Sequence, residues 1–392
     1  MRVMAERQVV QIVGDGVTGR WVTWRWGGQG RTGGVGEVPE AARVTDRLRA
    51  ALVVDGALTD RAAESELMTD LGMALLPAPL REQLLGAAHT GQHVEVRVAP
   101  SPSAAAVPWG LLVLSERGTR LLDVADVSWI APLLPRDVSE PAGRASWADA
   151  RSLPSLHILD PAQDTMGRVL EPGRPVAVAG QVGGAVVRGT RFGAVDLAEA
   201  LAGGLSRLFL LGHCVTSRTA ASTGFVLSDS DGAWPVPLDA ATLLRAPERW
   251  PMPPRVAVVA CASGVDMADH EPFGLATALL HAGAEAVQAT LWTLPTDQGL
   301  RRADPASGPA FTRLAEAIDR AQLADDPVQA LCSWQRGRLA EWRRPPSPGT
   351  SPLETSPLVW GSAMTMTAPS RRLGQQNRHS PPLPIDDTPP SM

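Results

Sequence analysis

Four short, nearly continuous apolar segments set the strongest limit on what this chain can fold into. They read LHIL, LFLLG, VAVVA and AVQATLW, and they start at positions 156, 208, 256 and 286. Such segments are typical of strands buried on both faces of a parallel sheet. Helical patterns alternate with them: DLAEALAGG, LDAATLLRA and FGLATALLHAG precede the second, third and fourth segments. This alternation predicts an α/β fold with a mostly parallel sheet and helices on both faces.

The chain before these segments has a different pattern. The stretch RQVVQIVGDGVTGRWVTWRW alternates around a Gly-rich turn, which predicts a β-hairpin. Helical patterns follow over about residues 39–54 and 64–88, the second interrupted at Pro77 and Pro79. Further strands are predicted at residues 93–100, 127–133 and 358–366, and further helices at 308–323 and 327–344.

These patterns suggest three regions. We expect an N-terminal hairpin and helical accessory region over residues 1–63 and the main α/β domain over residues 64–369. Residues 370–392 are rich in Pro and have no apolar period, so we expect them to be a disordered tail.

Composition excludes several classes of function. The net charge of −5 provides no basic surface for nucleic acid or anionic lipid. No apolar stretch approaches a membrane span or the core of a signal peptide. Three cysteines without CxxC spacing predict neither a zinc site nor a disulfide framework. No glycine-rich phosphate loop follows a strand, so a nucleotide cofactor is not expected. We therefore expect a cytoplasmic protein with reduced thiols and without metal, cofactor, nucleic-acid or membrane partners.

Two reactive side chains directly follow two of the apolar segments. His213 comes after LFLLG, and Cys261 comes after VAVVA. Ligands of open α/β sheets bind beyond the carboxyl ends of the strands, so both residues are expected at one edge of the sheet if their strands are parallel neighbours. They are 48 residues apart, which leaves room for one crossover helix and agrees with the His-to-Cys spacing of about 50 residues in caspase-type sites.

A thiol and an imidazole together support nucleophilic catalysis. A free thiol has a pKa of about 8.5 and is mostly protonated at neutral pH, but a neighbouring imidazole lowers that pKa and can protonate a leaving amine. Ser263 and Gly264 allow a tight turn, so the backbone N–H groups of Cys261 and Cys214 are candidate oxyanion donors. The alternative is that Cys261 merely packs at a strand end, since free cysteines are often buried. No Asp, Asn or Glu stands out as an orienting partner for His213.

Several motifs stand in the order and spacing of a known family. They are LFLLGHC, STGFVLSD, VAVVACASG and EPFGLATALLHAGAEAVQATLWTLPTDQ, with VPWGLLVL upstream and SPLVWGSAMTM as a closing strand. Over roughly residues 64–369 the chain resembles CHAT domains, which are caspase-like peptidases of the caspase and separase clan. The resemblance implies a caspase-like sheet with Cys261 as nucleophile and His213 as its acid–base partner. In this clan the pair normally works without a third orienting residue.

The chain departs from the family pattern near both of these residues. Cys214 stands where the family has Gly after the His, and a non-Gly residue resists positive φ. Ser263 stands where the family commonly has Thr. Ser263, Asp266 and Asp297 are candidate substrate-binding residues. The alternatives are a solvated loop for Asp266 and a helix cap or turn for Asp297.

The resemblance implies a cysteine endopeptidase that hydrolyses peptide bonds in a restricted protein substrate through an acyl-enzyme. Such peptidases act as regulated effectors in bacterial defence or signalling, so a separate sensor or activator protein is an expected partner. The alternative is a catalytically inactive CHAT-fold protein that serves as a binding or scaffold protein, and Cys214 is its main support.

Overall fold

A computed structural model provides the structure of the chain. It describes residues 7–16, 18–28, 31–131, 146–163, 166–178, 183–215, 223–228, 237–260, 274–345, 349 and 351–368. The predicted tail at 370–392 lies outside these residues.

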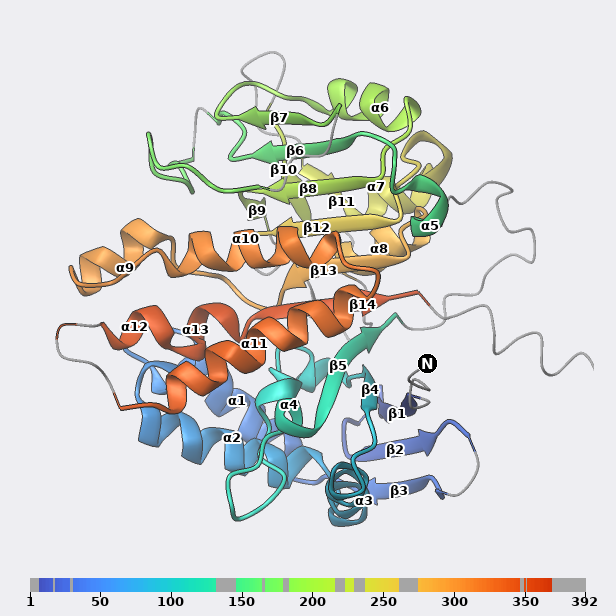
Figure 1. Ribbon diagram of the computed structural model, residues 1–392, viewed down its shortest axis with the longest axis vertical. Helices are drawn as coiled ribbons and strands as arrows, with labels where there is room; N and C mark the ends of the chain where they lie inside the picture. Colours follow the sequence, from blue (N-terminus) through green and yellow to red (C-terminus); the bar gives the residue numbers. More distant parts are fainter. Residues whose placement is uncertain are drawn as a thin grey trace, which may run out of the picture.

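One large, mostly parallel sheet runs through the molecule (Figure 1). Its eleven strands follow the order β3-β2-β1-β4-β5-β14-β13-β12-β8-β6-β7. The four apolar segments form β6 (Ser155–Leu159), β8 (Arg207–Leu211), β12 (Arg255–Val259) and β13 (Ala286–Thr290), and every residue of these strands is buried. The strands β13, β12, β8 and β6 pair in parallel in that order. The edge strand β7 (Ala185–Arg188) continues this half of the sheet. The predicted mixed α/β fold is confirmed.

The other half of the sheet starts from the N-terminal hairpin. Strands β1 (Gln8–Gly14), β2 (Trp21–Trp26) and β3 (Gly34–Glu37) pair antiparallel, while β1, β4 (Val94–Ala99) and β5 (Ala125–Ile130) pair in parallel. The alternation in β2 points Trp24 and Trp26 inward, and both indole N–H groups donate to Gln83 Oε1, at 3.0 and 2.7 Å. Because β1 pairs with β4, the predicted accessory region and the predicted main domain share one sheet.

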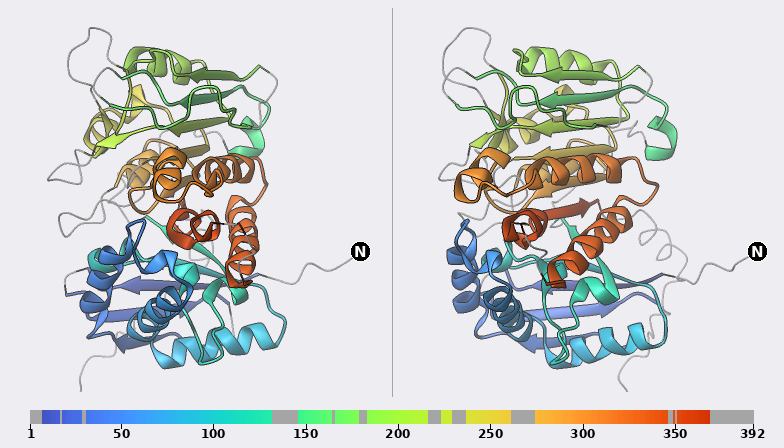
Figure 2. Two further views of the ribbon diagram at one scale, coloured as in Figure 1. Left: turned by 90° about the vertical axis from the view of Figure 1, so that its left-hand side faces the viewer. Right: turned by 60° about the vertical axis from the view of Figure 1, so that its left-hand side comes forward.

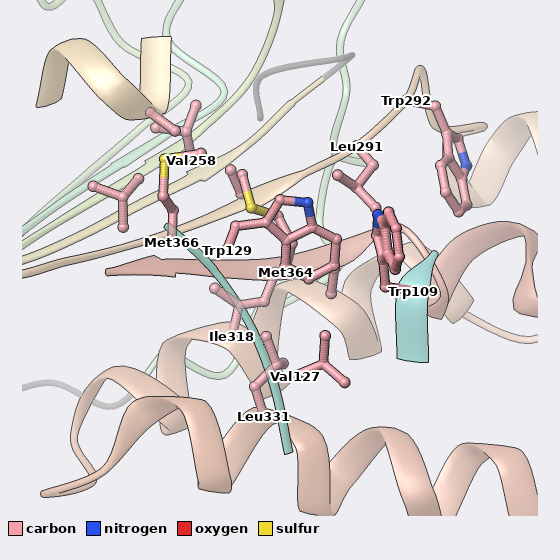
Figure 3. Packing of buried hydrophobic residues seen from close by; sticks show 14 of the residues in the cluster. Trp109, Val127, Trp129, Val258, Leu291, Trp292, Ile318, Leu331, Met364 and Met366 are labelled. Atoms are coloured by element: carbon pink, nitrogen blue, oxygen red, sulfur yellow. The ribbon is translucent and has the colours of Figure 1, made fainter. Parts of the chain in front are cut away.

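The two halves of the sheet meet at β14 (Ala363–Thr367). This strand pairs antiparallel with β13 and pairs in parallel with β5 through only two residue pairs, Met366 with Trp129 and Thr367 with Ile130. Buried side chains fill the junction, where Trp129 and Met364 pack near Ile318 and Leu331 (Figure 3). Apolar packing therefore supplements a short hydrogen-bonded ladder.

Helices cover both faces of the sheet. Helix α10 (Ala310–Gln322) contacts β8 and β12, and α11 (Pro327–Arg343) contacts β5 and β14; α7 (Ala240–Arg245) and α8 (Leu275–His281) lie on the opposite face (Figures 1 and 2). Phe311, Leu314 and Ile318 recur at helical spacing and give α10 its buried stripe. The remaining helices are α1 (Ala41–Ala51), α2 (Arg61–Leu75), α3 (Ala78–His89), α4 (Leu121–Val124), α5 (Trp147–Ala150), α6 (Ala194–Ala202), α9 (Asp297–Ala303), α12 (Pro352–Thr355) and α13 (Pro357–Trp360). Short 3₁₀ turns lie at Ala57–Thr59, Pro102–Ala104, Trp109–Leu111 and Pro247–Arg249.

A fully buried ionic group joins α10 to the sheet. Asp319 Oδ1 accepts hydrogen bonds from Arg207 Nη1 at 2.6 Å and from His157 Nε2 at 2.9 Å. Arg207 lies on β8, His157 lies on β6, and all three side chains are at most 1% exposed. Each buried charge or polar ring thus has a partner, which is the condition for tolerating such groups in a core.

In the part of the chain that the structure describes, no helix has both the length and the apolar character needed to cross a bilayer.

Candidate active site

The carboxyl ends of β6, β8 and β12 meet at one edge of the sheet. The register aligns Leu211 of β8 with Leu159 of β6 and with Val259 of β12. Main-chain pairing continues past the strands, since the N–H of Gly212 donates to Val259 O at 3.2 Å and the N–H of Asp160 donates to Leu211 O at 2.6 Å. The condition that the His and Cys strands be parallel neighbours is therefore met. Cys261 itself, with Ser263 and Asp266, lies outside the described residues.

His213 is half-buried at this edge, and a main-chain carbonyl holds its ring. His213 Nε2 donates a hydrogen bond to Gly167 O at 2.7 Å. Because a carbonyl oxygen only accepts, Nε2 must carry the proton, and in the neutral ring Nδ1 is the basic nitrogen. The backbone is also tied down, because the carbonyl of His213 accepts from the N–H of Val226 at 2.9 Å.

Gly212 permits the close packing behind His213. A Cβ at this position would lie 3.1 Å from Cζ of Phe225 and 3.3 Å from Cδ of Pro161. These distances are tighter than ordinary carbon contacts, so a side chain here would require Phe225 or Pro161 to shift by a few tenths of an ångström.

The loop that carries Gly167 is organised by Asp160, the residue directly after β6. Its side-chain Oδ1 accepts from the N–H of Val169 at 3.1 Å, and Oδ2 accepts from the N–H of Leu170 at 3.2 Å. Asp160 is only 4% exposed and has a φ of 50°. Asp is among the few non-Gly residues that enter this left-handed region readily.

Arg168 binds the same loop to its surroundings. Its guanidinium donates to Asp160 O and to Gly189 O, each at 3.0 Å. Farther along, Glu171 forms an ion pair with Arg301 of α9, and its carbonyl accepts from Arg188 of β7 at 3.2 Å. The segment around Gly167 is thus connected to β6, β7 and α9.

Cys214 begins the short strand β9 (Cys214–Val215), where the family pattern has a glycine. This strand pairs antiparallel with β10 (Gly224–Val226), and β10 pairs with β11 (Pro237–Asp239). Among the described non-glycine residues, Asp160 alone has a positive φ. The backbone at Cys214 therefore follows the extended path of a strand, a conformation open to any residue type.

Asp297 is buried at the start of α9, and its carboxylate faces the start of α10. Oδ1 accepts from the N–H of Phe311 at 2.8 Å, and Oδ2 accepts from the N–H and the hydroxyl of Thr312 at 3.2 and 2.5 Å. Both oxygens are thus engaged by otherwise orphaned donors of a helix N-terminus. This geometry is that of a helix cap, supplied from a neighbouring helix.

The Cys332 thiol, also within the described residues, lacks the properties of a nucleophile. Cys332 lies on α11, where its Sγ accepts from the N–H of Val127 at 3.3 Å. Burial raises the pKa of this thiol to about 12. At neutral pH it therefore remains protonated and is enclosed by the core. Within the described residues, no three His, Cys, Asp or Glu side chains gather as the ligands of a metal ion would.

Sequence reasoning identified His213 but missed the groups that hold it. The carbonyl of Gly167 leaves no signal in the sequence, because every residue carries one. Asp160 did have a signal: it directly follows the segment LHIL, as Cys261 follows VAVVA.

One solved structure shows a similar fold at low sequence identity. A crystal structure of the Saccharomyces cerevisiae separase–securin complex at 3.0 Å resolution matches with a TM-score of 0.52 and 10% identity, covering 93% of this chain and 30% of that chain. A structure of the same complex at 2.6 Å matches with a TM-score of 0.40 and 12% identity, covering 71% of this chain and 16% of that chain. No curated protein sequence matches. The present chain therefore spans less than a third of the length of the separase chain, and the similarity in fold is to that part alone.

Comparison with family models gives a direct match. The CHAT domain model matches residues 65–303, which is more than half of the 392 residues. The matched span runs from α2 to the end of α9 and includes both β8 and β12. The sheet order and the register at the carboxyl edge are consistent with this match. The chain belongs to the CHAT domain family, which has a caspase-like peptidase fold.

Proposed function

We propose that this protein is a cysteine endopeptidase that hydrolyses peptide bonds with Cys261 as nucleophile and His213 as acid–base partner. The observation that carries the proposal is the register of β8 and β12. Leu211 is paired with Val259, and His213 and Cys261 each follow their strand by two residues. Ala260, the last residue described before the proposed nucleophile, is buried at this edge, and Cys261 is the next residue in the sequence.

The hydrogen bond from His213 Nε2 to Gly167 O supports a separate role for each ring nitrogen of His213. With Nε2–H bonded to Gly167 O, Nδ1 accepts the proton of the Cys261 thiol. The thiolate attacks the carbonyl carbon of the scissile peptide, and the oxyanion accepts hydrogen bonds from the N–H groups of Cys261 and Cys214. The imidazolium then protonates the leaving amine as the C–N bond breaks, and a thioester remains.

Deacylation uses the same groups in reverse. His213 Nδ1 takes a proton from water, the hydroxide attacks the thioester carbonyl, and the thiolate leaves and regains its proton from the imidazolium. The Gly167 carbonyl stabilises the ring in its charged form and holds its orientation, a role that the Asp carboxylate fills in serine peptidases.

The substrate and partners belong to the same proposal. We expect a restricted protein substrate, and an activating protein that makes the enzyme a regulated effector in the cytoplasm. Ser263 and Asp266 follow the nucleophile in sequence and are candidates for contacting the substrate. Asp297 is a weaker candidate, because both of its oxygens already bind α10.

A binding protein without catalysis is the competing function. Its main support is the cysteine in place of the family glycine, and the extended backbone of Cys214 weakens that support because no left-handed conformation is required there.

Thiol alkylation distinguishes the two functions. Wild-type protein is treated with iodoacetamide near neutral pH, and the modification of each cysteine is followed by peptide mass spectrometry. An activated Cys261 is alkylated much faster than Cys332, and His213→Ala slows it, whereas His89→Ala, an exposed residue on α3, does not. If Cys261 is alkylated at the same rate in wild-type protein and in His213→Ala, the proposed dyad is refuted. An electrophilic peptide library then identifies the preferred substrate sequence.

A further inference from the structure

We infer that Asp160 and Arg168 form a positioning clamp for His213, acting through the Gly167 carbonyl. The inference rests on the proposed function, since it names residues that determine how that site is set. Among the described residues, neither side chain hydrogen-bonds to His213 itself. Asp160 binds main-chain N–H groups of residues 166–171, the segment whose Gly167 carbonyl accepts the hydrogen bond of His213 Nε2. Arg168 belongs to this segment and binds it to the carbonyls of Asp160 and Gly189.

The first half of the clamp is the carboxylate of Asp160. It accepts two consecutive main-chain N–H groups, those of Val169 and Leu170, at 3.1 and 3.2 Å. Two bonds to adjacent peptides fix both the position and the rotation of the segment, because a single bond would leave it free to pivot. The left-handed backbone of Asp160, at a φ of 50°, aims the short side chain back at the loop. A non-Gly residue with a positive φ is uncommon, and such residues concentrate at functional sites.

The second half is the guanidinium of Arg168, which lies between Gly167 and Val169. One nitrogen donates to Asp160 O and another to Gly189 O, each at 3.0 Å. Arg168 thus donates a hydrogen bond to Asp160, whose carboxylate accepts the N–H of Val169, the residue after Arg168. Gly167 therefore lies directly next to a segment fixed from two sides.

The consequence concerns the tautomer of His213. A carbonyl held at 2.7 Å from Nε2 selects the ring form that carries its proton on Nε2 and leaves Nδ1 basic. If the loop shifts, the ring loses this partner, and the two tautomers and ring orientations become available. A misplacement of about 1 Å at such a site lowers a rate by roughly 100-fold.

Four variants distinguish the effect of the hydrogen bonds on His213 from the effect of the backbone conformation of Asp160. Asp160→Ala removes both acceptors and disfavours the positive φ, whereas Asp160→Gly removes the acceptors but tolerates that φ. Asp160→Asn tolerates the φ and keeps one acceptor oxygen. Arg168→Gln removes the guanidinium from its two carbonyls. Arg302→Ala, an exposed residue of α9, serves as the control.

The primary readout is the tautomer of His213, measured by NMR on protein labelled with ¹⁵N-histidine in a Cys261→Ala background. The chain has seven histidines, and His213→Gln identifies the relevant signal. We expect the Nε2–H form in the parent and in Arg302→Ala, a mixture of tautomers in Asp160→Ala, Asp160→Gly and Arg168→Gln, and a smaller change in Asp160→Asn. In proteins that retain Cys261, we expect Asp160→Gly to slow alkylation of that thiol by roughly 100-fold.

The outcomes distinguish this inference from the proposed function. An unchanged tautomer in Asp160→Gly and Arg168→Gln would overturn the clamp, and so would wild-type behaviour of Asp160→Gly alone, because the carboxylate would then be dispensable. If Asp160→Ala fails to fold in a thermal melt, the Gly, Asn and Gln variants still decide. Alkylation of Cys261 that is independent of His213 in the wild-type chain would refute the peptidase function, while the tautomer measurement would remain a valid test of the clamp.

Discussion

The buried ionic group between α10 and the sheet gives the sharpest stability prediction. Asp319→Ala removes the carboxylate that receives Arg207 Nη1 at 2.6 Å and His157 Nε2 at 2.9 Å. The guanidinium of Arg207 has no exposed surface, so water cannot replace the lost carboxylate without opening the core. Breaking a buried pair by removing one partner costs about 3–5 kcal/mol.

This magnitude is large compared with the total free energy of unfolding of about 5–15 kcal/mol of a typical protein. With a urea m-value of about 3 kcal/mol/M, the midpoint of unfolding of Asp319→Ala falls by about 1 M or more. The assay is urea unfolding followed by tryptophan fluorescence. Asp70→Ala is the matched control, because the Asp70–Arg47 pair is about 40% exposed and is expected to contribute at most about 1 kcal/mol.

A double variant tests whether the loss of stability in Asp319→Ala comes from the unpaired buried charge of Arg207. Arg207→Met with Asp319→Asn removes both charges and leaves an amide oxygen that can accept from His157. It should therefore be more stable than Asp319→Ala. If Asp319→Ala and Asp70→Ala lower the midpoint equally, burial does not determine how much these charged pairs contribute to stability.

Three further predictions concern the side chains of Cys332, Asp297 and Asp123. Burial raises the pKa of Cys332 to about 12, so only about 1 thiol in 10⁵ is ionised at pH 7, and we expect alkylation of this residue only in denaturant, by mass spectrometry. Asp297→Ala removes the acceptors at the start of α10 and should lower stability by about 1–2 kcal/mol in thermal melts; a large rise in KM at unchanged Tm would instead indicate substrate binding. Burial alone would raise the pKa of Asp123, but hydrogen bonds from Arg343 and from backbone lower it overall. Its contribution is therefore present above about pH 4 and lost as pH falls through the lowered pKa, and Arg343→Ala should flatten the acid limb of a stability–pH curve.

The central strands were predictable because a strand buried on both faces has a nearly continuous apolar sequence. Strands β8 and β12 are apolar at nearly every position, and their pairing in parallel is the arrangement that such segments predict. The helices on either side of Pro77 were predictable for another reason, because apolar residues recur at helical spacing there and proline interrupts a helix.

The junction between the two halves of the sheet was not predictable. Trp129 and Met366 are paired across a separation of 237 residues, through a ladder of only two residue pairs. No local pattern specifies which buried strand lies beside which. That choice depends on how the helices α10 and α11 and the apolar side chains between them fill the space.

The sequence by itself determined which segments are buried strands and which two side chains follow them, because periodicity and side-chain chemistry are properties of the residues. It could not determine what holds His213. The partner is the main-chain carbonyl of Gly167. Asp160 binds main-chain N–H groups of the same loop, and Arg168 binds the main-chain carbonyls of Asp160 and Gly189. Every residue carries such groups, so only the path of the folded chain decides which of them meets the imidazole.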